Sequence, residues 1–250
     1  MDLMNKKILV TREATQAIEF NEMIKQALGQ VLSAPLIKIN PIKVNNLNLS
    51  HYNWIFFTSA NGVNCFMNQI ENISIFNHVK IAVVGSKTEK ALKAHGLEAD
   101  FVPTVYNAEK MSKEFINTYP TANDLLLVRG NLSRKVLPEF FMNKHIDFEM
   151  ITVYETVVNK AIKSKLNHIF KTEKVDFITF MSPSTINSFL ELLDIKYHEI
   201  ALSTKVMCIG TTTERIALEH GFKNVSIPNH FTAESMFEKM LEIERLKNNE

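Results

Sequence analysis

Short turns rich in serine, threonine and glycine recur along the sequence and are its most numerous candidates for chemistry. They read TSANG from Thr58, GSKT from Gly85, RGNLS from Arg129, SPST from Ser182 and GTTT from Gly210. Hydroxyls and backbone N–H groups at the start of a helix donate hydrogen bonds to anions such as carboxylates and phosphates. The turns therefore predict contacts with an anionic ligand. The alternative is ordinary helix capping, which contributes about 1 kcal/mol for each cap.

Two pairs of these turns belong to an internal repeat. Ser59 and Ser182 lie 123 positions apart, and Gly85 and Gly210 lie 125 positions apart. The second offset then continues without a gap, so that VYNAEKM in the first copy is matched by HFTAESM in the second. A looser echo upstream matches KILVTRE with LLLVRGN. A period of this length is far above the roughly 20–50 residues of a solenoid and indicates a duplicated domain-sized unit.

Each copy alternates short apolar strands with segments of helical spacing. The expected strands are Lys7–Thr11, Val31–Leu36, Trp54–Thr58, Lys80–Val84, Phe101–Val102, Leu125–Val128, Glu149–Val153, Phe177–Met181, Val206–Ile209 and Val225–Ile227. Gly96 and Gly221 stand where a helix end favours positive φ. Apolar strands that alternate with helices are typical of parallel sheets covered on both faces. We therefore expect an α/β protein with two doubly wound parallel-sheet domains. The turns would then lie at the carboxyl ends of the strands, where such sheets bind ligands.

Two extended segments are candidates for crossings between the domains. We expect one discontinuous domain of residues 1–38 with 160–250, and a second of residues 43–152, joined by linkers at about 39–42 and 153–159. A single cut near Thr121 is the simpler alternative.

Composition narrows the classes of function. The net charge of +1 gives no bulk electrostatic reason to bind nucleic acid or an anionic membrane. No apolar run approaches the roughly 20 residues of a membrane span, and the first residues lack the apolar core of a secretory signal. Cys65 and Cys208 form no CxxC motif. We expect a cytoplasmic protein that binds a small molecule, with neither nucleic acid nor membrane as a partner.

Motifs for bound cofactors are missing. The stretch VVGSKTEK resembles the end of a phosphate-binding loop, but Lys80 occupies the position of the required first glycine. No GxGxxG supports a dinucleotide site, no spacing of His, Cys, Asp and Glu indicates a metal, and no GxSxG elbow supports acyl transfer. We expect no cofactor and no metal.

Several segments, taken in order and with their spacing, resemble the uroporphyrinogen-III synthase family. They are ILVTR, WIFFTSANGV, VVGSKTEKAL, RGNLSRKVLPE, ITVYETV, ITFMSPSTINSF and CIGTTTERIALEHG, and together they cover nearly the whole chain. The resemblance implies two α/β domains on a two-stranded linker, with the active site in the cleft between them. It also implies closure of hydroxymethylbilane, a linear tetrapyrrole with eight carboxylates, to uroporphyrinogen III. Water is lost and the last pyrrole ring, ring D, is inverted. Such a reaction needs orientation more than a strong nucleophile.

The resemblance also implies roles for particular residues. Tyr154 matches the tyrosine of the domain junction, and its neutral phenol can donate a hydrogen bond to the departing hydroxyl; packing of the linker is the alternative. Arg12 and Arg129 end strands and are candidates for pairing with substrate carboxylates, or are surface arginines. The implied turn contacts are Thr58, Ser59, Ser86, Thr88, Asn131, Ser182, Ser184, Thr211, Thr212 and Thr213. Thr211 departs from the family pattern, in which proline can stand at this position.

A rival hypothesis remains open. Two α/β lobes could close on an anionic metabolite as a non-catalytic sensor, and turnover of hydroxymethylbilane separates the two functions. In either case we expect a monomer.

Overall fold

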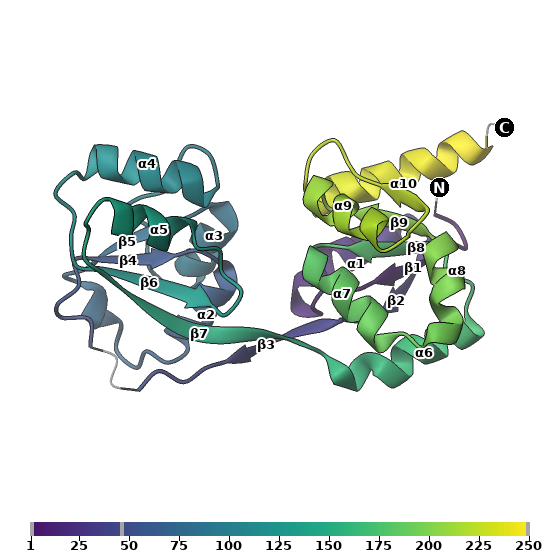
Figure 1. Ribbon diagram of the computed structural model, residues 1–250, viewed down its shortest axis with the longest axis horizontal. Helices are drawn as coiled ribbons and strands as arrows, with labels where there is room; N and C mark the ends of the chain where they lie inside the picture. The colour runs from purple at the N-terminus through teal and green to yellow at the C-terminus, as the bar shows by residue number, and fades with distance from the viewer. Residues whose placement is uncertain (1–2, 46–47, 249–250) are drawn as a thin grey trace. The chain divides into compact units, whose positions relative to one another are not determined.

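The computed structural model describes residues 3–45 and 48–248 of the chain (Figure 1). Contacts divide it into two compact units. Unit 1 combines the residues up to Lys38 with those from Val157 onward, and unit 2 is Ile39–Thr156. No helix in the described parts of the chain is both long and apolar enough to cross a membrane.

Unit 1 is built on a five-stranded sheet with the order β10-β9-β8-β1-β2, and all of its strand pairs are parallel. The strands are β1 (Lys7–Val10), β2 (Gln30–Ser33), β8 (Phe177–Phe180), β9 (Lys205–Cys208) and β10 (Asn224–Ser226). The helices are α1 (Ile18–Gln26), α6 (Lys163–Thr172), α7 (Pro183–Leu192), α8 (His198–Ser203), α9 (Thr211–Glu219) and α10 (Ala233–Asn248).

Alternation along the strands of unit 1 gives the sheet two buried faces. Leu9 of β1 packs in a cluster with α6–α9, whereas Ile8 and Val10 pack in another with α1 and α10. Successive side chains of a strand point to opposite faces, so a continuously apolar strand needs helices on both. The expected doubly wound architecture is confirmed for this unit.

Unit 2 repeats the arrangement with the strand order β3-β7-β6-β4-β5. Its strands are β3 (Ile37–Pro41), β4 (Trp54–Phe57), β5 (Lys80–Val83), β6 (Leu125–Gly130) and β7 (Phe148–Val158). Its helices are α2 (Ala60–Met67), α3 (Ser86–Ala94), α4 (Ala108–Thr118) and α5 (Val136–Asn143). Ile55 and Phe57 face α2 and α3, and Trp54 and Phe56 face α4 and α5. The pairs β4–β5, β4–β6 and β6–β7 are parallel.

The chain passes between the units within two neighbouring strands. β3 and β7 are hydrogen-bonded neighbours, and each contains one of the two crossing points. The first linker was predicted as an extended segment, and Ile37–Pro41 forms a strand that pairs with the long β7. The predicted strand at Phe101–Val102 was wrong, since Phe101 makes only an isolated bridge to Ala82.

The glycines expected at helix ends have the expected conformation. Gly96 follows α3 with φ of 78°, and Gly221 follows α9 with φ of 87°. Only glycine enters this region without a steric penalty from a Cβ atom.

Helix α10 is held to the sheet of unit 1 by a buried carboxylate. The Glu244 side chain is 2% exposed, and its two oxygens lie 2.8 Å from Lys6 Nζ and 2.6 Å from Lys205 Nζ. Desolvation by burial raises the pKa of Glu244, but hydrogen bonds from Lys205 and Lys6 outweigh it, so the pKa lies below the ordinary value of 4.5. The charged carboxylate therefore stabilises the folded unit, and protonation weakens it.

Replacing Glu244 with glutamine removes this charge and keeps the shape of the side chain. Hydrogen bonds to charged groups contribute about 1.5–3 kcal/mol, so we expect the opening free energy of unit 1 to fall by about 2 kcal/mol near neutral pH. The contribution is complete above the unfolded pKa of about 4.5 and is lost as pH falls through the lower folded pKa. Amide hydrogen exchange in β1 and β9, measured from pH 7 downward, gives the opening free energy of each protein. The difference in opening free energy between wild type and Glu244→Gln should narrow only as the pH falls through the folded pKa of Glu244.

Glu242→Gln is the matched control. Its carboxylate is 52% exposed in the same helix and pairs with Lys239, so its effect should stay within about 0.5 kcal/mol. If the difference in opening free energy between wild type and Glu244→Gln stayed constant down to pH 3, the stabilising role of the Glu244 charge would be contradicted.

Candidate functional site

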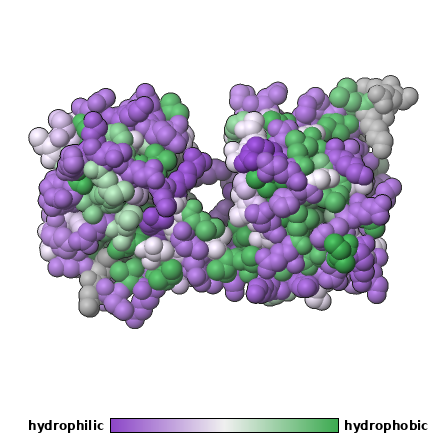
Figure 2. Space-filling view, in the orientation of Figure 1, coloured by the Kyte–Doolittle hydropathy of each residue, from purple (hydrophilic) through white to green (hydrophobic). Residues whose placement is uncertain are grey.

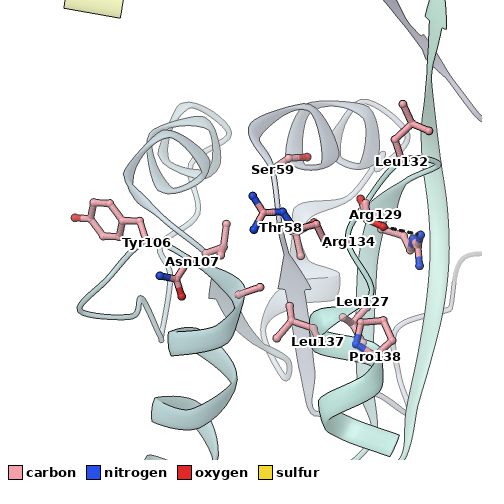
Figure 3. A pocket seen from close by; sticks show the side chains of 13 residues that line it. Thr58, Ser59, Tyr106, Asn107, Leu127, Arg129, Leu132, Arg134, Leu137 and Pro138 are labelled. Atoms are coloured by element: carbon pink, nitrogen blue, oxygen red, sulfur yellow. Dashed lines mark hydrogen bonds between the residues drawn. The ribbon is translucent and has the colours of Figure 1, made fainter. Parts of the chain in front are cut away.

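A cavity of about 310 Å³ lies at the carboxyl edge of the unit 2 sheet (Figure 3). Its lining is divided by chemistry. Leu127, Leu137 and Pro138 are apolar and buried, or nearly so, and the turn after β4 adds two hydroxyls. The lining residues are Thr58, Ser59, Val84, Tyr106, Asn107, Ala108, Leu127, Arg129, Leu132, Ser133, Arg134, Leu137 and Pro138. An apolar floor with a few polar groups above it is the usual composition of a small-molecule site.

The N-termini of two helices open onto this cavity. Ser59 caps α2 by accepting a hydrogen bond from Gly62 N at 3.0 Å, and Asn107 caps α4 by accepting one from Lys110 N at 2.7 Å. Both caps also line the cavity. The positive ends of two helix dipoles therefore converge there and favour a negatively charged ligand. Ser59 and Asn107 each cap a helix and also line the cavity, so a role in capping does not exclude a role in ligand binding.

Two arginines line the cavity in different states. The Arg129 guanidinium donates to the backbone oxygens of Gly130 at 3.3 Å and Ser133 at 3.2 Å, and in Figure 3 it points away from the cavity. Arg134 reaches over the cavity toward Thr58 and Ser59 in the same view. Its side chain is 78% exposed, and its only ion pair among the described residues is a long one of 3.9 Å to Glu109. Such an exposed pair contributes little, so Arg134 can exchange Glu109 for a ligand carboxylate at low cost.

Tyr154 lies beside this cavity, buried at 8% exposure. Its hydroxyl is 3.0 Å from Ser59 Oγ. The register of β7 against β6 shifts at this point, since Arg129 is paired with Thr152 and Gly130 with Tyr154. The irregularity adds one residue to β7 and re-aims the side chain that follows, as β-bulges do.

Gly130 provides the space for the tyrosine ring. A Cβ atom at this position would lie 2.3 Å from Tyr154 Cζ and 2.7 Å from its hydroxyl oxygen. No side chain fits at such distances, so the ring position depends on glycine. Asn131 fixes the same strand, because its N–H donates to Tyr154 O and its side-chain oxygen accepts from Thr156 N at 2.9 Å. Asn131 was predicted as a ligand contact, and the structure places its amide on β7.

The pair of hydroxyls on Ser59 and Tyr154 carries two protons. One of them forms the hydrogen bond between the two oxygens, whichever oxygen donates. Ser59 Oγ also accepts from Gly62 N. The second proton is left to point toward a further acceptor, and Ser59 lines the cavity. A ligand oxygen in the cavity could take that position.

The remaining predicted turn residues differ in access. Ser182 and Ser184 of unit 1 are half-buried and hydrogen-bond each other at 2.9 Å. Thr211 and Thr212 are exposed in the first turn of α9. Ser86 is half-buried at the first position of α3.

Thr88 and Thr213 occupy equivalent buried positions. They are 4% and 3% exposed, and their N–H groups donate to Gly85 O and Gly210 O. Their side chains form part of the packed helix starts and are not presented on the surface of the turns.

Arg12 of unit 1 lies in an acidic environment. Desolvation lowers its pKa, while Glu234, Glu13 and Glu19 oppose the shift. These carboxylates compete with any anionic ligand for Arg12. Arg129, in contrast, has no ion pair among the described residues.

Sequence reasoning missed Tyr106, Asn107, Leu132, Ser133 and Arg134 as cavity residues. Ser133 and Arg134 stand within the quoted segment RGNLSRKVLPE, and the basic residue there was a usable signal. No group of three or more His, Cys, Asp and Glu side chains suited to a metal occurs in the described ranges.

The fold and the cavity define a class: an α/β protein of two duplicated parallel-sheet units, with an arginine-bearing pocket suited to a small anionic ligand. The profile of the family described as uroporphyrinogen-III synthase HemD matches residues 18–238. The chain belongs to this family.

Individual relatives agree with the family assignment. The chain is 28% identical over 244 residues to the uroporphyrinogen-III synthase of Chlorobaculum parvum, with 95% of this chain and 98% of that protein covered. It is 26% identical over 252 residues to the porphyrin biosynthesis protein HemD of Ruminiclostridium josui, covering 96% of this chain but only 49% of that longer protein. The solved structure of uroporphyrinogen-III synthetase from Helicobacter pylori shares the fold, with a TM-score of 0.70 at 19% identity, and 96% and 100% of the two chains are covered.

Gly130→Ala tests how the tyrosine is positioned. The added methyl must displace the Tyr154 ring and break the Ser59–Tyr154 hydrogen bond, so we expect Tyr154 to become more exposed. Overpacking of this kind lowers the free energy of unfolding by about 1–3 kcal/mol. The measurement is solvent accessibility of the phenol together with thermal unfolding. Gly62→Ala is the matched control, because its Cβ would lie 3.2 Å from Ser59 Oγ and 3.9 Å from the Tyr154 ring, and it should disturb the ring less. Equal behaviour of the two variants would contradict the steric role of Gly130.

Proposed function

We propose that this chain converts hydroxymethylbilane to uroporphyrinogen III without a cofactor, with loss of water and inversion of ring D. Family membership is the main support. The observation that carries the proposal is the cavity of unit 2, where two helix N-termini and the loosely paired Arg134 meet above an apolar floor. The pyrrole rings of the substrate are apolar and match the floor of the cavity, and its carboxylate substituents match the helix N-termini and Arg134.

The cavity is small relative to the substrate. About 310 Å³ is at the lower limit for ligand pockets, so we assign it to one pyrrole ring and its carboxylates. Arg134 and the Asn107 turn bind the carboxylates, and Leu127 and Leu137 contact the ring. The accessible turn residues of unit 1, Ser182, Ser184, Thr211 and Thr212, are likewise proposed as contacts for substrate carboxylates.

The hydroxyl pair of Ser59 and Tyr154 is proposed to assist the departure of water. Electrons from the pyrrole nitrogen expel the hydroxyl, and the proton that is not shared between Ser59 and Tyr154 is transferred to the leaving oxygen, which departs as water. The carbocation-like methylene that results then closes on the substituted carbon of ring D. The protein selects that carbon by holding the chain in a folded geometry, because orientation is its main catalytic resource.

We propose that the protein acts as a monomer in the cytoplasm, with the tetrapyrrole as its small-molecule partner.

Turnover tests the proposal directly. Purified protein that has been treated with a chelator and coupled to a source of hydroxymethylbilane should yield mainly the type III isomer, read by separating the oxidised porphyrins. Closure without guidance gives the isomer in which ring D is not inverted. An isomer ratio that is the same with and without protein would overturn the enzymatic function, and tight binding without turnover would support the rival sensor.

Tyr154→Phe tests the proton role. General acid assistance contributes about 10²–10⁴-fold, so we expect kcat to fall within that range while the fold is retained, because the ring still fills the space above Gly130. Single-turnover kinetics under saturating substrate give the comparison. Thr213→Ala is the control, since this buried threonine presents no hydroxyl to the surface, and its kcat should change less. If kcat of Tyr154→Phe fell only a few-fold, the phenol would orient the substrate and would not act as the proton donor.

A further inference from the structure

An exposed aromatic side chain lies at the same place in each half of the duplication. Tyr106 of unit 2 is 61% exposed, and Phe231 of unit 1 is 59% exposed. They stand 125 positions apart, the offset that also relates Gly85 to Gly210. Exposed apolar side chains occur at other places on both units (Figure 2), and a single one needs no explanation. The recurrence of an exposed aromatic side chain at equivalent positions of the two units does need an explanation.

The local structure that holds each ring is also the same. Asn107 N donates to Val105 O at 2.8 Å, and Thr232 N donates to His230 O at 2.8 Å, so each aromatic residue is the centre of a three-residue turn. The next side chain then caps a helix in both units, by accepting from Lys110 N in one and from Ser235 N in the other. Each ring therefore projects from a hydrogen-bonded turn.

A glycine lies under each ring. A Cβ atom at Gly85 would be 2.9 Å from Tyr106 Cβ, and one at Gly210 would be 3.0 Å from Phe231 Cγ. The backbone does not demand glycine here, because φ is 177° at Gly85 and −179° at Gly210, an extended conformation open to any residue. The absence of a side chain serves the placement of the ring.

We propose that Tyr106 and Phe231 are substrate-binding side chains, each of which packs against one pyrrole ring of the linear tetrapyrrole. The inference rests on the proposed function and extends it from the carboxylates of the substrate to its rings. Tyr106 lines the cavity that also contains Arg134 and Leu132, and the Leu132 side chain, on the opposite side of the cavity in Figure 3, is 65% exposed. Aromatic rings attract one another in offset and edge-to-face arrangements. The pocket edge thus offers an apolar surface for the ring and a cation for its carboxylates.

Alanine variants of the two aromatic residues test the inference. Tyr106→Ala and Phe231→Ala should each raise KM for hydroxymethylbilane about threefold to tenfold, with a smaller change in kcat. The Kd for uroporphyrinogen III, titrated without oxygen, should rise in parallel. Tyr106→Phe should stay within about twofold of wild type, because the ring is kept. Met142→Ala is the matched control: this side chain is 57% exposed at the end of α5 in the same unit and should leave KM unchanged.

A double-mutant cycle separates ring placement from general damage. Gly85→Ala pushes on Tyr106 and should raise KM in the wild-type background, but it should have little further effect on KM in Tyr106→Ala. Any cost to the cap of α3 appears equally in both backgrounds and cancels. Strictly additive effects would show that Gly85 does not act through the ring.

The outcomes distinguish this inference from the proposed function. Wild-type turnover to the type III isomer, with KM and Kd of both alanine variants equal to wild type, overturns only the inference. Failure of the wild-type protein to change the isomer ratio overturns the proposed function and the inference with it. Thermal unfolding of each variant shows whether a change in KM comes with an intact fold.

Discussion

Parallel pairing of the strands is the constraint on which the rest of the structure depends. Within each sheet the parallel ladders carry the carboxyl ends of neighbouring strands to the same edge. Turns that are distant in sequence are thereby brought together. In unit 2 the turns after β4 and β6 and the segment before α4 surround one cavity, although Thr58 and Arg134 are far apart in the chain. Helices must begin at the same edge, so their dipoles add to the hydroxyls and arginines there.

The sequence predicted the parts of this architecture that depend on local pattern and on repetition. Apolar strands, turn hydroxyls and the glycines at helix ends each have a short-range physical cause, and the duplication repeats the same pattern in both halves of the sequence. Ile37–Pro41 was predicted only as an extended linker segment, because its strand partner β7 lies more than 100 residues away in the sequence and pairing with β7 decides its conformation. At Phe101 an apolar dipeptide suggested a strand, but the segment offers a single bridge.

The candidate site was less predictable, because side-chain direction within a turn depends on packing. Thr88 and Thr213 carry the same hydroxyl as Thr211 and Thr212, yet one face of the first helical turn is buried and the other is exposed. Arg129 and Arg134 are five positions apart in the same segment, and only the structure shows that Arg129 is held by backbone oxygens while Arg134 hangs over the cavity. Tyr106 could be named from its repeat partner Phe231, but neither residue type reveals its exposure.

Duplication also explains why the tyrosine has no counterpart in unit 1. The echo of KILVTRE in LLLVRGN places Arg12 where unit 2 has Gly130. A Cβ atom at that position excludes a ring like that of Tyr154. Ser182, the counterpart of Ser59, accordingly pairs with Ser184 of its own turn and not with a phenol. The two units thus share the scaffold, the glycine-supported aromatic side chains and the turns proposed to bind anions. The hydroxyl pair proposed to donate a proton is found in unit 2, where Gly130 has no side chain and the irregular β7 positions the ring.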